Sequence, residues 1–122
     1  MANPFVHVEL NTQDLPKAKK FYSALFGWQL QDMPMGDGKT YTMIGVGEGT
    51  GGGMMTAPDP DIPPHWLAYV GVDDIEASTK KAKDLGATLV MGVTPVANYG
   101  KFSIFKDPTG ALFAMWQSSP QK

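Results

Sequence analysis

The sequence contains no cysteine, and this absence removes several kinds of chemistry. Disulfide bonds, thiolate metal ligands and a thiol nucleophile are all excluded. Basic residues are not gathered into blocks either. Ten basic residues stand against twelve acidic ones, giving a formal net charge of −2. A nucleic-acid-binding surface needs clustered positive charge, so nucleic acid is not an expected partner.

Long apolar runs are also missing. No stretch approaches the roughly 18 apolar residues that a membrane-spanning helix needs. Polar and charged residues from His7 to Lys17 interrupt the N-terminal region where a secretory signal would lie. We therefore expect a soluble, cytoplasmic protein with no membrane partner. The 122 residues, 43% of them hydrophobic, are sufficient for the core of a single domain spanning 1–122.

The glycine-rich stretch 45–53 does not fit a phosphate-binding loop. No lysine followed by serine or threonine comes after its last glycine, and a strand-like segment follows instead of a helix. The spacing of a serine nucleophile elbow is absent as well. We interpret the stretch as a flexible hairpin turn.

What the sequence does contain is an internal repeat. The segment His7–Leu15 lies sixty residues before Leu67–Ile75, and both resemble an apolar strand followed by an acidic helix cap and an amphipathic helix. The repeat predicts two modules, at about 4–57 and about 65–117. The proline-rich segment 58–64 is the expected linker between them.

Each module is predicted to contain a strand, a helix and three further strands, which makes the fold class α+β. In the first module, Asp14 can cap the helix and Gly27 can end it. The apolar helix faces are expected to run to Leu25 in the first module and to Leu85 in the second. The expected strands are 5–10, 28–33, 40–46 and 53–57, then 66–72, 88–91, 101–106 and 111–117.

The paired modules, together with the segments Leu25–Gly27 and Phe105–Gly110, resemble the vicinal oxygen chelate superfamily. The resemblance covers roughly residues 4 to 117. This superfamily includes glyoxalases, bleomycin-resistance proteins, fosfomycin-resistance enzymes and extradiol dioxygenases. The resemblance implies two βαβββ modules in tandem, whose mixed curved sheets enclose a cavity for a small molecule. It also implies a homodimer.

The resemblance further implies where the metal ligands of metal-dependent members lie, namely at His7, Met55, Leu67 and Ala114. Of these, His7 alone offers a suitable donor atom. Leucine and alanine have none, and a thioether is too soft for the divalent ions of such sites. One ligand cannot hold a catalytic ion. No metal cofactor is therefore expected, which argues against metal-dependent glyoxalase or dioxygenase activity.

An alternative metal site remains open. Side chains two apart on a strand share a face, so His7, Glu9 and His65 could converge as two histidines and a carboxylate. Such a group suits a divalent metal such as Zn, Fe, Ni or Mn. Without a metal, His7 could be a structural residue, a polar contact or a general base, with Glu9 as the second catalytic candidate.

Aromatic and methionine side chains indicate an adaptable apolar cavity, because rings offer flat surfaces and methionine repacks easily. The alternative is that these residues serve the core or a dimer contact. The segment 96–100 lies where the family often places a flexible lid. The candidate ligand-binding residues are His7, Met55, His65, Tyr69, Asn98, Tyr99 and Trp116.

Three functions follow from these patterns. The first is a metal-independent protein, similar to bleomycin-resistance proteins, that binds or sequesters a small aromatic or amphipathic ligand. The second is an enzyme of lyase, isomerase or dioxygenase-like type, using either the alternative metal site or His7 and Glu9 as acid and base. The third is a non-catalytic subunit that serves an interaction and binds no ligand.

Overall fold

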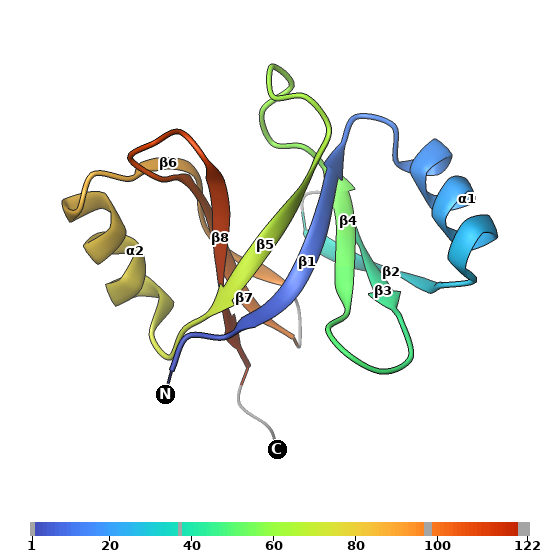
Figure 1. Ribbon diagram of the computed structural model, residues 1–122, viewed down its shortest axis with the longest axis horizontal. Coiled ribbons are helices and arrows are strands. Elements are labelled where there is room, and N and C mark those ends of the chain that lie inside the picture. Colours follow the sequence, from blue (N-terminus) through green and yellow to red (C-terminus); the bar gives the residue numbers. More distant parts are fainter. Residues whose placement is uncertain (1, 37, 97–98, 120–122) are drawn as a thin grey trace. The chain divides into compact units, whose positions relative to one another are not determined.

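The computed structural model describes residues 2–36, 38–96 and 99–119, and its elements confirm the βαβββ pattern in both modules (Figure 1). The first module holds β1 (Phe5–Thr12), α1 (Leu15–Phe26), β2 (Gln29–Gly36), β3 (Lys39–Gly45) and β4 (Gly52–Thr56). The second holds β5 (His65–Gly71), α2 (Ile75–Asp84), β6 (Thr88–Val96), β7 (Gly100–Lys106) and β8 (Leu112–Ser118). The fold class is therefore α+β, as predicted.

The chain divides into two compact units whose boundaries differ slightly from the repeat. The first-module unit comprises residues 7–67, and the second-module unit comprises residues 1–6 and 68–122. The N-terminal residues belong to the second-module unit because their hydrogen bonds are made there. The Gly71 N–H donates to the Pro4 carbonyl at 2.8 Å, and the Asn3 side chain donates to the Gly71 carbonyl at 2.8 Å.

In the first-module unit the strand order is β2-β3-β4-β1, with β1 parallel to β4 and the other pairs antiparallel. Residues paired in register point to the same side of a sheet. Glu9 pairs with Gly53 and Asn11 with Met55, so these residues share one face, which we call the histidine face because His7 lies on it. The opposite face, which we call the helix face, carries Leu10, Ile44 and Met54, the core that packs against α1.

Helix α1 begins and ends where the sequence predicted. The Asp14 side chain accepts a hydrogen bond from the Lys17 N–H at 3.2 Å. Gly27 closes the helix in the left-handed conformation, at φ 70°, where glycine carries no steric penalty. The predicted apolar faces are wrong at their last positions, because Leu25 is 56% exposed and Leu85 is 70% exposed. Both residues lie at the end of a helix, beyond the reach of the sheet core.

The second-module unit repeats the plan with the strand order β5-β8-β7-β6. Strand β5 is parallel to β8, and β8-β7 and β7-β6 are antiparallel. Its helix α2 is capped by Asp74, whose side chain accepts from the Ala77 N–H at 3.1 Å. The core between α2 and the sheet consists of Val72, Ile75, Phe105 and Met115.

Strand β6 is longer than predicted, because it runs on to Val96, which pairs directly with Gly100 of β7. The lid predicted at 96–100 includes residues 97–98, which lie outside the described residues. The prediction ended β6 too early because two register shifts between Leu89 and Thr94 interrupt the alternation of apolar and polar residues.

The segment Phe105–Gly110, noted in the sequence, contains the turn Asp107–Gly110 that follows β7. The Asp107 carboxylate accepts from the Thr109 N–H at 2.8 Å, the Thr109 hydroxyl at 2.6 Å and the Ala111 N–H at 3.0 Å. These bonds, the Thr109 side chain foremost, lower the pKa of Asp107. Gly110 completes the turn at φ 94°, a conformation that other residues rarely adopt.

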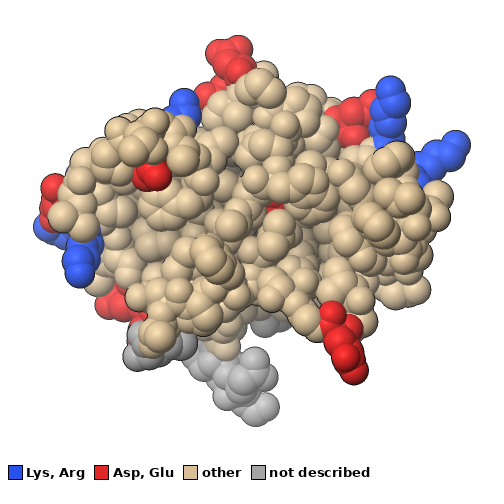
Figure 2. Space-filling model, in the orientation of Figure 1, with Lys and Arg blue, Asp and Glu red and all other residues tan. Residues whose placement is uncertain are grey.

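Charged side chains are scattered over one face of the protein (Figure 2). On the face that Figure 2 shows, lysine and acidic side chains of the described residues stand scattered, and they form no continuous basic surface there. Within the described part of the chain, no helix is long and apolar enough to cross a membrane.

Candidate functional site

The first candidate site is a pair of ring side chains on the histidine face. Strand β1 supplies His7 and strand β3 supplies Tyr41. The His7 Nε2 atom lies 2.6 Å from the Tyr41 hydroxyl, and the two rings are stacked at 26°. Burial lowers the pKa of His7 from 6.5 to about 4, so the imidazole is neutral at pH 7. A neutral imidazole can both donate and accept hydrogen bonds.

Glu9 and Asn11 extend this pair inside the first-module unit. The Asn11 side chain donates to the Glu9 carboxylate at 2.7 Å, and Glu9 exposes none of its surface. Burial, the charge of Glu9 and a hydrogen bond with Glu9 together raise the pKa of Tyr41, which stays protonated. His7, Tyr41, Glu9 and Asn11 thus form a connected set of hydrogen-bonding side chains, which we call the polar chain.

Gly53 makes room for the polar chain. A Cβ atom at this position would overlap the ring of Tyr41, so a side chain larger than hydrogen would push the phenol away. The sequence analysis did not identify Tyr41 or Gly53 as site residues. Tyr41 lies two residues before Met43 on a predicted strand, so the sequence could have placed both on one face. Gly53 lies within a run of glycines, and nothing in the sequence distinguishes it from the others.

The residues present do not fit a divalent metal. Two of the alternative ligands make hydrogen bonds within the protein, since His7 Nε2 bonds to Tyr41 and the Glu9 carboxylate accepts from Asn11. His65 Nδ1 lies 2.8 Å from the Pro63 carbonyl. Among the residues that the structure describes, no three His, Asp or Glu side chains are grouped as a metal site requires. The family positions Met55, Leu67 and Ala114 are all buried and offer no hard donor atom. We therefore derive no chemical step through a metal.

The predicted ligand residues of the second-module unit form a separate cluster of rings. Tyr69 lies 6.1 Å from Phe102 and 6.5 Å from Trp116, measured between ring centroids. Tyr69 and Phe102 are fully buried and Trp116 is half-buried. Tyr99 stands at the exposed hairpin, and Asn98 lies outside the described residues. The structure thus brings Tyr69 and Trp116 together, with Phe102 added.

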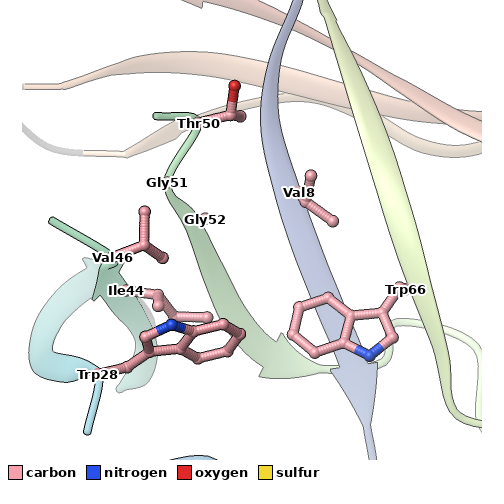
Figure 3. Close-up of a pocket in the computed structure, with 8 residues that line it drawn as sticks. All are labelled: Val8, Trp28, Ile44, Val46, Thr50, Gly51, Gly52 and Trp66. Atoms are coloured by element: carbon pink, nitrogen blue, oxygen red, sulfur yellow. The ribbon is translucent and has the colours of Figure 1, made fainter. Parts of the chain in front are cut away.

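A pocket that the sequence analysis did not predict lies on the helix face of the first-module unit (Figure 3). Its volume is about 300 Å³. The indoles of Trp28 and Trp66 are nearly perpendicular there, at 85°, with centroids 6.3 Å apart. We call it the tryptophan pocket, and its lining residues are Val8, Trp28, Ile44, Val46, Thr50, Gly51, Gly52 and Trp66.

The two βαβββ modules place the chain in the class of paired-βαβββ proteins. The family model of the glyoxalase, bleomycin resistance protein and dioxygenase superfamily matches residues 5–115 of the sequence. The chain belongs to this superfamily, and the resemblance seen in the sequence is confirmed.

Two curated proteins resemble this chain over most of its length. The chain is 32% identical, over 93% of its length, to the Mycobacterium tuberculosis protein named "Putative glyoxylase CFP32". It is 29% identical, over 89% of its length, to the anthracycline biosynthesis protein DnrV of Streptomyces peucetius. The chain spans 44% and 45% of these two relatives, a little under half of each.

Solved structures agree on the fold. The methylmalonyl-CoA epimerase of Mycobacterium tuberculosis superposes with a TM-score of 0.68 and 20% identity, covering 95% of this chain and 88% of that one. A hypothetical protein of Bacillus halodurans C-125 superposes with the same TM-score and 15% identity, covering 100% and 99%. At such identities the similarity concerns the fold alone.

Proposed function

We propose that the protein binds a small aromatic or amphipathic molecule without a metal, using the histidine face of the first-module unit. The observation that carries this proposal is the polar chain. Burying Glu9, Asn11 and Tyr41 costs desolvation, and titratable groups with perturbed pKa values gather at functional sites. The half-buried His7 is the member that remains partly accessible to a ligand.

The chemistry of His7 favours a polar contact to a neutral ligand. A neutral imidazole suits a hydroxyl or carbonyl group, and Met55, paired in register with Asn11, supplies an apolar neighbour on the same face. Tyr69, Tyr99 and Trp116, together with Asn98 and His65, stay proposed ligand contacts to be tested individually. Superfamily membership supports a small-molecule partner in general, and the identity of that molecule is left to experiment.

The test uses 4-hydroxybenzaldehyde, a small ring with both a hydroxyl and a carbonyl group, in buffer with excess EDTA. Backbone amide NMR signals of β1 and β3 are expected to shift in a saturable way. His7→Ala and Tyr41→Phe should each weaken binding about tenfold, because each removes one hydrogen-bond partner of a buried pair. Leu85→Ala, an exposed site in the second-module unit, is the control and should bind as the wild type does.

Binding that appears only after Zn(II), Fe(II), Ni(II) or Mn(II) is added would contradict the metal-independent proposal. Metal analysis of untagged protein purified without chelator makes the same distinction before any ligand is chosen. Unchanged affinity in His7→Ala would remove His7 from the site. No binding by any aromatic hydroxyl or carbonyl compound would favour the interaction-subunit alternative.

A second candidate function is acid–base chemistry on a carbonyl compound, favoured by the bond between His7 and Tyr41. Glu9 is fully buried, so its proton exchange with a ligand would have to pass through Tyr41 and His7. This function predicts exchange of the hydrogen next to a ligand carbonyl in D2O, followed by proton NMR. Exchange that persists in both His7→Gln and Tyr41→Phe would exclude it.

A further inference from the structure

Aromatic side chains of α1 hold both indoles of the tryptophan pocket. Trp28, two residues after the end of α1, stacks on Tyr22 with ring centroids 5.7 Å apart. The ring centroid of Phe26 lies 4.9 Å from that of Trp28. Trp66 meets the same tyrosine edge-on at 5.3 Å and donates its indole N–H to the Tyr22 hydroxyl at 3.3 Å. Both indoles are therefore held in place by α1, and the corner between them is present before any ligand arrives.

Glycines leave the floor of the pocket bare. A Cβ atom on Gly52 would overlap the Val8 carbonyl, and a Cβ on Gly51 would lie 3.0 Å from the Ile44 carbonyl. Glycine at these positions lets the backbone at the start of β4 approach strands β1 and β3 closely. It also exposes the peptide groups to the pocket, because no side chain covers them. A flat molecule can lie against such a surface, which a branched side chain would obstruct.

The lining specifies the chemistry of the occupant. Among the described residues that line the pocket, none carries a charge and Thr50 alone has a side-chain hydroxyl. The indole N–H of Trp66 donates to the Tyr22 hydroxyl. A charged ligand would lose its hydration without a partner here, whereas an aromatic ring gains edge and face contacts with two indoles. A volume of about 300 Å³ lies at the lower end of small-molecule sites, which suits a ring system of one to three rings.

The pocket is separate from the histidine face. Val8 lines it, and Val8 points to the opposite side of the sheet from its neighbours His7 and Glu9. Trp66 is 41% exposed and Val8 is 37% exposed, so the entrance is open. We propose that the tryptophan pocket is a second binding site, which takes an uncharged planar aromatic molecule on the helix face.

The test uses N-phenyl-1-naphthylamine, an uncharged ring compound whose fluorescence rises in apolar surroundings. One saturable site per chain is expected. Trp28→Leu removes one wall and Val46→Phe fills the space, and each should raise the dissociation constant at least about tenfold. Phe113→Leu removes a ring from the second-module unit and should leave the dissociation constant unchanged. Thermal unfolding and circular dichroism check that each variant folds.

Affinity that is unchanged in Val46→Phe, or that falls equally in Phe113→Leu, would overturn the proposal. A second copy of the chain is the competing occupant, and sedimentation velocity separates the two. The proposal expects the same mass with and without the probe. A dimer that dissociates as the probe binds would assign the pocket to a second copy and overturn it.

Discussion

His7 makes a hydrogen bond inside the protein at a position that the superfamily resemblance assigns to a metal ligand. It occupies the position where metal-dependent members of the superfamily are expected to hold a ligand, yet its Nε2 atom bonds to Tyr41. Burial keeps the imidazole neutral, and Tyr41 connects it to a carboxylate that solvent does not reach.

The pKa of His7 gives a prediction for stability. The unfolded chain binds a proton near pH 6.5, whereas the folded chain binds it near pH 4. Between these values the unfolded state holds more protons, so the free energy of unfolding falls as the pH is lowered. The part of the free energy of unfolding that depends on a neutral His7 is fully present above pH 6.5. Its loss by pH 4 is on the order of 3 kcal/mol.

The measurement is urea unfolding of the wild type and His7→Gln at several pH values between 4 and 7. The variant should show a shallower pH dependence, because glutamine does not titrate. The lowered pKa values of Asp32 and Asp107 contribute to the pH dependence of both proteins alike, so the difference between the two curves reports on His7. Parallel curves for the two proteins would contradict the prediction.

At the scale of elements, the two modules share the same hydrogen bond at the start of their helices. Asp14 and Asp74 hold the same capping position, and each side chain accepts from the N–H three residues on. The acceptor satisfies a donor that the helix itself leaves unpaired. The same capping bond therefore occurs at the βα connection of both modules.

Asp74→Ala is therefore expected to lower the free energy of unfolding by about 1 kcal/mol. Asp74→Asn keeps an oxygen acceptor and should lose much less. Chemical denaturation of the three proteins in parallel measures the difference. An equal loss in both variants would attribute the effect to the negative charge at the helix N-terminus, and the cap prediction would be wrong.

At the scale of the whole molecule, helix α1 carries apolar side chains that are exposed to solvent. Phe21 and Leu25 are each more than half exposed, and apolar groups gathered on a surface mark interaction sites. We propose a homodimer that covers this outer side of α1, in keeping with the pairing that the superfamily resemblance implies.

Sedimentation equilibrium should therefore report a dimer, and Leu25→Lys should shift it toward monomer by placing a charge in the interface. The repeat supplies a control in Leu85→Lys, at the exposed residue that follows α2, which should leave the dimer intact. Monomeric wild-type protein at micromolar concentration would contradict the proposal. Equal dissociation in both variants would place the interface elsewhere.

The sequence by itself determined the order of elements, the two capped helices and the poor fit of the inherited metal positions. These follow from local rules, since capping, turn chemistry and alternation depend on residues near one another. Met55, Leu67 and Ala114 could be judged from the chemistry of their side chains alone.

Tertiary structure decided which residues meet. Tyr41 reaches His7 from 34 positions away, and it does so because Gly53 leaves space for its ring. Trp28 and Trp66 come together because Tyr22 on α1 contacts both. Strand register and helix packing bring these distant residues into contact, and neither can be derived from the spacing of residues along one segment. The fold could therefore be read from the chain, whereas the polar chain and the tryptophan pocket required the folded molecule.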